Sequence, residues 1–224
     1  MSVNEIEVIN FAETPSLVNR YMLELRDEKI QKDPLRFRCN LDRIGEIMAY
    51  EISKRLDYKE VKVHTPLGVA DCREPADEIV LATILRAGLP FHHGFLNYFD
   101  RAENAFVSAY RRYREKGGDT FDVVVEYMAS PSIEGKTLIL VDPMLATGSS
   151  MDLAYRALLE KGTPAKIHVA SVIASSQSVK YICEHFPVDR TTLWCGDIDA
   201  EINDHSYIIP GLGDAGDLAY GEKD

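Results

Sequence analysis

The sequence of 224 residues lacks the features that define several large classes of protein. It has no run approaching the roughly 18 apolar residues that a membrane-spanning helix needs. Its first residues, MSVNEIEVINF, have neither the basic nor the apolar region of a secretion signal. The four cysteines form no Cys-x-x-Cys pair, which argues against a disulfide framework and a zinc site. We therefore expect a soluble cytoplasmic protein with free thiols and no membrane contact.

An excess of basic residues is also missing. The chain has 25 lysines and arginines against 36 aspartates and glutamates, which gives a net charge of -11. Proteins that bind nucleic acids usually carry a basic patch, so we expect no nucleic-acid partner. Hydrophobic residues make up 46% of the sequence, enough to bury the core of a single domain over residues 1–224.

Two helices are expected near the start of the chain. Apolar residues recur at helical spacing over residues 16–31, Ser16 is a favoured N-cap type, and Asp33-Pro34 should end the helix. The same spacing over residues 40–56 predicts a second helix that packs against the first. We therefore expect residues 1–60 to form a helical hood.

Strands and helices alternate over the middle of the chain. Residues 78–85, EIVLATIL, form an apolar run typical of a strand buried on both faces of a parallel sheet. Further strands are expected over residues 105–111, 121–128, 137–142 and 166–173, helices over 89–98, 150–161 and 176–185, and a polar loop over 112–120. The alternation predicts an α/β fold for residues 61–206, a mostly parallel twisted sheet flanked by helices. Residues 207–224 are glycine-rich and are expected to form a loop.

One strand leads into a segment with the composition of a phosphate site. A buried strand is expected over residues 138–141, and Asp142 follows it directly. Residues 146–150, ATGSS, are then expected to begin a helix. Ligands bind at the carboxyl ends of strands in open α/β sheets. Free amides, the helix dipole and hydroxyl groups at a helix N-terminus attract phosphate, and a carboxylate beside it suits ribose hydroxyls. A plain capped helix start with a glycine turn is the alternative that this segment alone leaves open.

Two further segments match motifs only superficially. Residues 211–216, GLGDAG, fit G-x-G-x-x-G, but a dinucleotide site needs a strand before the glycines and a βαβ unit around them. These glycines are instead expected to shape a loop whose backbone groups read the edge of a flat base. Residues 197–201, DIDAE, resemble the start of a calcium loop, yet Ile202 stands where glycine is needed, so we expect a solvated acidic loop.

The motifs together resemble those of one enzyme family. Residues 141–151, VDPMLATGSSM, are similar to the phosphoribosyl-diphosphate motif of type I phosphoribosyltransferases, and Asp142-Pro143 is the form found in uracil phosphoribosyltransferases. Residues 84–89, ILRAGL, and residues 207–217, YIIPGLGDAGD, resemble the arginine turn and the uracil-binding segment of that family. Residues 25–27, LRD, show a weaker similarity to the same family. The resemblance implies the type I phosphoribosyltransferase fold, with an N-terminal helical hood and a C-terminal base-binding loop.

The resemblance also implies an activity. Members of the family transfer the 5-phosphoribosyl group from 5-phospho-α-D-ribose 1-diphosphate to uracil, giving UMP and diphosphate in pyrimidine salvage. Mg²⁺ is expected to be bound mainly through the diphosphate, with no dedicated protein cage. The implied partners are phosphoribosyl diphosphate, uracil, GTP as an effector, and further copies of the chain in a homodimer or higher oligomer. Two alternatives stay open: a non-catalytic RNA-binding pyrimidine regulator of the same fold, and a phosphoribosyltransferase for another base.

The same resemblance implies which residues carry out catalysis and which contact each substrate. The residues expected to be catalytic are Arg86, Arg111, Asp142 and Asp214. Those expected to contact phosphoribosyl diphosphate are Arg86, Arg111, Asp142, Pro143, Met144, Leu145, Ala146, Thr147, Gly148, Ser149, Ser150 and Asp214. Those expected to bind uracil are Ile208, Gly213, Asp214 and Ala215. The sequence departs from the family pattern at Ser149, where glycine is usual, and after Arg111, whose neighbour Arg112 is an alternative to it.

Overall fold

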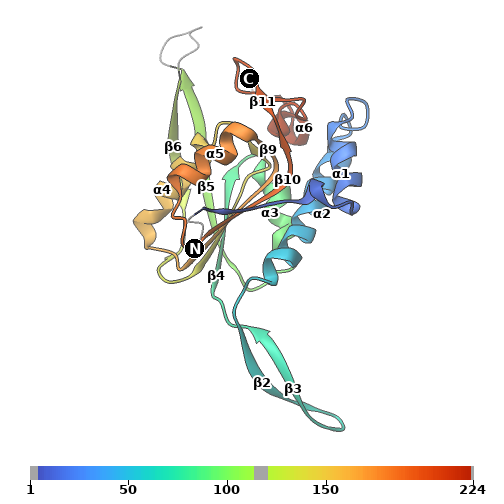
Figure 1. Ribbon diagram of the computed structural model, residues 1–224, viewed down its shortest axis with the longest axis vertical. Coiled ribbons are helices and arrows are strands. Elements are labelled where there is room, and N and C mark those ends of the chain that lie inside the picture. The colour runs from blue at the N-terminus through green and yellow to red at the C-terminus, as the bar shows by residue number, and fades with distance from the viewer. Residues whose placement is uncertain (1–4, 114–120, 223–224) are drawn as a thin grey trace.

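The computed structural model describes residues 5–113 and 121–222, with the backbone alone for residues 109–113 and 121–124. Its central layer is a sheet with the strand order β1-β10-β9-β7-β4-β5-β6 (Figure 1). These strands are β1 (Glu7–Asn10), β4 (Ile79–Leu85), β5 (Glu103–Tyr113), β6 (Phe121–Ala129), β7 (Thr137–Val141), β9 (Lys166–Ser175) and β10 (Thr191–Asp199). Neighbouring strands are parallel except β5 and β6, which are antiparallel. The predicted mostly parallel α/β sheet is confirmed.

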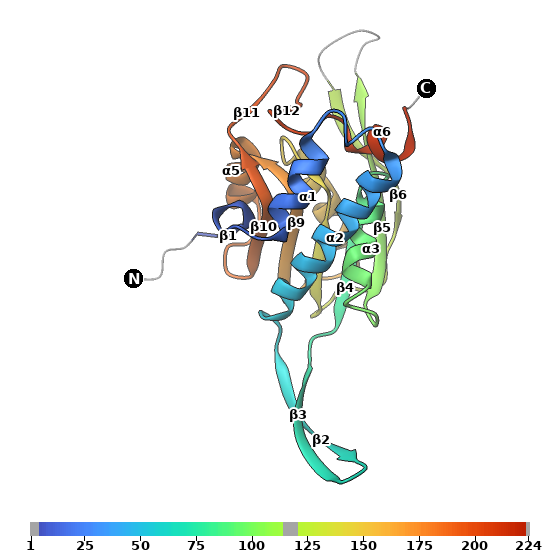
Figure 2. The same ribbon diagram turned by 90° about the vertical axis from the view of Figure 1, so that its right-hand side faces the viewer.

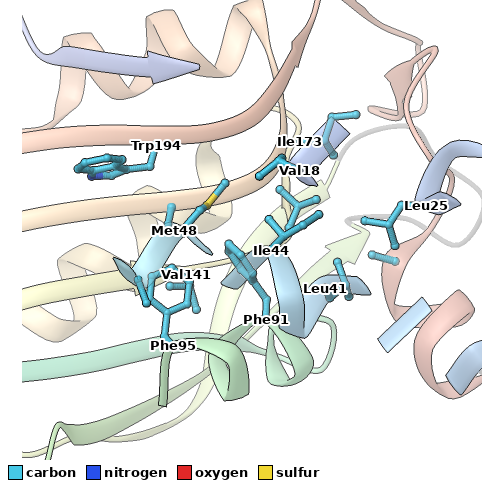
Figure 3. Close-up of a cluster of buried hydrophobic side chains, with 14 of the residues drawn as sticks. Val18, Leu25, Leu41, Ile44, Met48, Phe91, Phe95, Val141, Ile173 and Trp194 are labelled. Carbon is cyan, nitrogen blue, oxygen red and sulfur yellow. The ribbon is translucent and has the colours of Figure 1, made fainter. Parts of the chain in front are cut away.

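Helices cover both faces of this sheet. They are α1 (Leu17–Arg26), α2 (Pro34–Ser53), α3 (Gly88–Leu96), α4 (Ser149–Leu158) and α5 (Ser176–His185). Along β7, Leu138 and Leu140 pack in a cluster with α4 and α5, whereas Ile139 and Val141 pack in a cluster with α1, α2 and α3 (Figure 3). Neither face of β7 meets water, which explains its unbroken apolar sequence. No helix among the described residues is long and apolar enough to cross a membrane.

The two helices expected within residues 1–60 are both present, with different bounds, and they lie with α3 on one face of the sheet. Ser16 caps α1 in a capping box with Asn19, as its residue type indicated, but α1 ends at Arg26. The prediction that Asp33-Pro34 ends a helix is wrong, because this pair begins α2. The Asp33 side chain accepts hydrogen bonds from the first amides of α2, and Pro34 occupies the first helical position, where no N-H donor is needed.

A hairpin that the sequence did not predict projects from the body of the protein. It consists of β2 (Tyr58–Thr65) and β3 (Gly68–Pro75), and Figures 1 and 2 show it extending away from the sheet. Most of its residues are exposed, and Leu67 at the tip is 99% exposed. Val61 and Val63 alternate with polar residues in β2, so the strand pattern was present in the sequence but was not used in the prediction. The predicted core of residues 61–206 therefore contains a segment outside the central sheet.

The C-terminal region is more ordered than the predicted loops. Residues 197–201 are not a solvated loop, since Asp199 ends β10 and is 8% exposed. The tail, defined as residues 207–222, is only partly irregular: β12 (Ile208–Ile209) pairs with β11 (Glu201–Ile202), and α6 (Ala215–Tyr220) follows. The glycine content concealed α6, which is short and is capped by Asp214.

Candidate active site

Two neighbouring parallel strands bring the predicted catalytic residues to one edge of the sheet. β4 pairs with β7, so Arg86 and Asp142 follow adjacent strands at the same end. Gly88, which begins α3, packs tightly there: a Cβ atom on it would lie 2.1 Å from Thr83 Oγ1 and 3.5 Å from the carbonyl oxygen of Val141. A glycine therefore lets the arginine turn, residues 84–89, pack against the end of β7.

The loop from β7 to α4, residues 142–150, opens directly into the helix. Gly148 is the N-cap of α4 at φ +83° and has no side chain that could accept from the helix amides. Thr147 Oγ1 and Ser149 Oγ lie 2.7 Å apart and share a hydrogen bond. The side chains of Pro143 and Leu145 are buried, so they hold the loop in place, whereas the residues from Ala146 to Thr147 are partly exposed. This geometry leaves the positive end of the α4 dipole at the loop.

The Asp142 carboxyl group is partly exposed but poorly solvated. Burial raises its pKa from 3.8 to about 7, against the opposing effect of a hydrogen bond from the Met144 N-H. The backbone N-H of Asp142 donates to the carbonyl oxygen of Ala170 on β9 at 3.1 Å, which fixes the start of the loop. A carboxylate in such surroundings is strongly stabilised by any positive charge that forms beside it.

Arg86 connects the arginine turn to the tail. Its Nη2 donates to the carbonyl oxygen of Gly221 at 3.1 Å and to Asp217 Oδ1 at 3.3 Å. Its Nε is buried and has no hydrogen-bond partner among the residues that the structure describes. The Arg86 side chain as a whole is 38% exposed, and an arginine with exposed donors can bind an anion.

The tail is fixed to the body by an ion-pair network that the sequence did not reveal. Arg26 at the end of α1 donates from both Nη atoms to Asp199, at 2.8 Å each, and from Nη2 to Asp197 at 2.7 Å. It also donates to the carbonyl oxygen of Gly211 at 3.0 Å, while the Gly211 N-H donates to Asp199 at 2.8 Å. Burial acts to raise the pKa of Asp199, but hydrogen bonds from Arg26 and the Gly211 N-H hold this pKa below its usual value. The similarity at residues 25–27 was the only signal in the sequence that pointed to Arg26.

The predicted uracil-binding residues lie together in the tail. Ile208 and Ala215 are 4% and 1% exposed, and Gly213 adopts φ +93° between them. Asp214 Oδ1 accepts a hydrogen bond from the Asp217 N-H at 3.0 Å, so Asp214 caps α6. Through Asp217, this turn lies beside Arg86, and the structure brings the tail and the arginine turn together.

Two predictions fall in the part of the chain with little structural description. Arg111 lies on β5 with its backbone opposite Val123, but the structure does not describe its side chain or that of Arg112. Residues 114–120 of the predicted loop lie outside the described residues. The choice between Arg111 and Arg112 therefore stays a prediction.

The described side chains around the site form no cluster of metal ligands. Within residues 5–113 and 121–222, no group of three or more histidine, cysteine, aspartate or glutamate side chains could hold a metal ion. Of the carboxylates near the site, Asp197 and Asp199 are paired with Arg26 and Asp214 caps a helix. That Mg²⁺ is bound through the diphosphate stays a prediction.

A mostly parallel sheet flanked by helices, with a helix-opening loop after β7 and an arginine turn after β4, is the arrangement of a type I phosphoribosyltransferase. The family model described as uracil phosphoribosyltransferase matches residues 13–222, and the chain belongs to this family. A relative named uracil phosphoribosyltransferase from Porphyromonas gingivalis is 62% identical over 218 residues, covering 97% of this chain and all of the relative. Another of that name, from Methanothermobacter thermautotrophicus, is 41% identical over 84% of this chain and 85% of its own. The solved structure of the AQ2163 protein from Aquifex aeolicus superposes with a TM-score of 0.84 at 30% identity, covering 96% of this chain and 98% of that one.

Proposed function

We propose that the protein transfers the 5-phosphoribosyl group of 5-phospho-α-D-ribose 1-diphosphate to N1 of uracil, giving UMP and diphosphate in pyrimidine salvage. The observation that carries this proposal is the convergence of Asp142, Arg86 and the tail at one edge of the sheet. Membership of the uracil phosphoribosyltransferase family supports uracil as the acceptor.

The chemistry requires opposite charges to be stabilised a short distance apart. As the bond to the diphosphate breaks, positive charge develops on the ribose and negative charge on the leaving group. In this proposal Asp142, which follows β7, stabilises the ribose cation, and the partly exposed side chain of Arg86, which follows the neighbouring β4, binds the diphosphate. Positioning and electrostatic stabilisation account for such catalysis without a covalent nucleophile.

The two ends of the reaction are assigned to different segments. The 5-phosphate binds at the start of α4, to the backbone amides and hydroxyl groups of residues 146–150. Uracil binds to backbone groups of the tail near Ile208, Gly213 and Ala215, because its N3-H and two carbonyl groups match peptide groups. Asp214 lies at the junction of the two substrates, and Arg111 assists Arg86 with the diphosphate.

Further partners complete the proposal. Mg²⁺ held through the diphosphate would neutralise part of the charge of the leaving group. The exposed apolar side chains of the hairpin, Val63, Leu67 and Val69, support assembly into a homodimer or higher oligomer, which light scattering of the purified protein tests. GTP as an effector and a cytoplasmic location remain predictions, the first tested by assays with and without GTP.

A direct assay tests the proposed reaction. The purified protein is incubated with phosphoribosyl diphosphate and Mg²⁺ and with uracil, cytosine, orotate or guanine in parallel, and the nucleotide products are separated by chromatography. We expect UMP from uracil and no nucleotide from the other bases. A nucleotide from another base would redefine the acceptor, and no product from any base would contradict the proposal.

A further inference from the structure

The loop of residues 142–150 rests on the first turn of α5, a helix to which the reaction so far assigns no role. Ser175 Oγ donates to the carbonyl oxygen of Ala146 at 2.5 Å, and Ser178 Oγ donates to that of Leu145 at 2.5 Å. Both serines are completely buried. In the same loop, β8 (Met144–Leu145) pairs with β9, and the Ile173 N-H donates to the carbonyl oxygen of Pro143 at 3.0 Å.

The helix start determines where each hydroxyl proton points. Ser175 and Ser178 form a capping box: Ser175 Oγ accepts from the Ser178 N-H at 2.9 Å, and Ser178 Oγ accepts from the Ser175 N-H at 3.1 Å. Each oxygen thus accepts one hydrogen bond from the helix and has its single proton to donate. For Ser178, the carbonyl oxygen of Leu145 is nearer than that of Ser175, which lies 2.8 Å away.

These bonds fix the direction of two loop amides. The peptide bonds after Leu145 and Ala146 are trans, and in a planar trans peptide the C=O and the following N-H point in opposite directions. Holding the carbonyls of Leu145 and Ala146 toward α5 therefore turns the N-H groups of Ala146 and Thr147 away from α5. These N-H groups lie just before the start of α4, where phosphate is favoured.

A second contact from α5 supports the same loop. Gly148 packs against Tyr181, since a Cβ atom on Gly148 would lie 2.8 Å from Tyr181 Cδ1. The Tyr181 hydroxyl donates to Asp152 Oδ2 in the first turns of α4 at 3.2 Å. The loop and the start of α4 are thus braced by one helix at several successive points.

We propose that Ser175 and Ser178 are positioning residues for the 5-phosphate, which act by orienting the amides of Ala146 and Thr147 toward it. This inference rests on the proposed function, because it takes residues 146–150 as the 5-phosphate site. The serines touch no substrate. They preorganise donors that would otherwise have to order when the phosphate binds.

The test compares ligands that occupy different halves of the site. Ser175→Ala and Ser178→Ala are titrated with ribose 5-phosphate, which engages the 5-phosphate site, and with magnesium diphosphate, which engages Arg86. We expect the Kd for ribose 5-phosphate and the KM for phosphoribosyl diphosphate to rise about tenfold in each variant, as for a lost buried hydrogen bond, with little change in kcat. The Kd for diphosphate should stay within about twofold of wild type.

Controls separate positioning from folding. Ser132, an exposed residue before the start of β7, donates from Oγ to the carbonyl oxygen of Lys161 at 3.2 Å, at the opposite end of that strand. Ser132→Ala removes this hydroxyl-to-carbonyl bond away from the site, and we expect both Kd values to stay unchanged. Ser178→Cys keeps the shape of the side chain but donates weakly, so it carries the test where Ser178→Ala does not fold. Unchanged ribose 5-phosphate binding in folded variants, or equal weakening of both ligands, would overturn the proposal. A wild-type enzyme that forms no UMP would instead overturn the proposed function.

Discussion

Replacing Asp142 by asparagine is expected to stabilise the ligand-free protein, and to do so increasingly as the pH rises. Burial raises the pKa of Asp142 from 3.8 to about 7, so the folded state binds its proton more tightly than the unfolded chain does. Below about pH 4 the carboxyl group is neutral in both states and does not lower the free energy of unfolding. Between about pH 4 and pH 7 the unfolded chain ionises while the folded state keeps its proton, so the free energy of unfolding falls. Above about pH 7 the folded protein carries a poorly solvated charge and the loss of stability is complete.

The magnitude follows from the size of the pKa shift. At about 1.4 kcal/mol per unit, a rise from 3.8 to about 7 corresponds to about 4 kcal/mol. Because the carboxyl group keeps some contact with water, we expect about 2 kcal/mol, or a Tm increase of about 4–8 °C for a chain of this size. Asparagine has nearly the same shape and retains an oxygen that can accept from the Met144 N-H.

Urea unfolding of wild type and Asp142→Asn at pH 5.5, 7.0 and 8.5, followed by circular dichroism, measures this effect. The difference in unfolding free energy should grow with pH, whereas Asp71→Asn, at an exposed site on the hairpin, should show no such trend. A difference independent of pH, or a variant less stable than wild type at pH 8.5, would refute the reasoning. The same substitution should nearly abolish UMP formation, because it removes the carboxylate assigned to the ribose cation. A gain in stability together with a loss of activity is expected where a residue placed for catalysis costs stability.

Three other substitutions test the remaining parts of the site. Arg86→Ala should lower kcat/KM by about 100-fold or more in steady-state assays, since it removes the diphosphate contact, and near-wild-type kinetics would show that assignment wrong. Arg26→Met should destabilise the protein by about 3 kcal/mol in urea unfolding, because Asp199 loses its ion pair while it stays buried; adding Asp199→Asn should recover part of that loss. Gly148→Ala should raise the KM for phosphoribosyl diphosphate about tenfold, because φ +83° and the contact with Tyr181 both exclude a side chain, and an unchanged KM would contradict this.

The local sequence was sufficient to predict a strand where the strand is buried along its whole length. β4 and β7 are buried on both faces, so their unbroken apolar runs predicted them correctly. The alternating pattern of β2 was not used, and α6 is too short to show a helical period, so both the hairpin and α6 escaped prediction. Asp33-Pro34 was misread because the same pair that stops one helix also suits the first positions of the next.

The sequence by itself determined the α/β class, because strands and helices alternate along the chain. It also determined the loop that opens α4 and the choice of Arg86 and Asp142 as candidates, since each of these depends on a few consecutive residues. Only the tertiary structure decided that Arg26 holds Asp199 and Gly211, and that Ser175 and Ser178 hold the loop carbonyls of Ala146 and Leu145. These partners are far apart in the chain, and no local propensity encodes a contact between them. Parallel strands and the helices packed on them bring the partners together. Because these groups have little contact with water, each needs a hydrogen-bond partner within the protein.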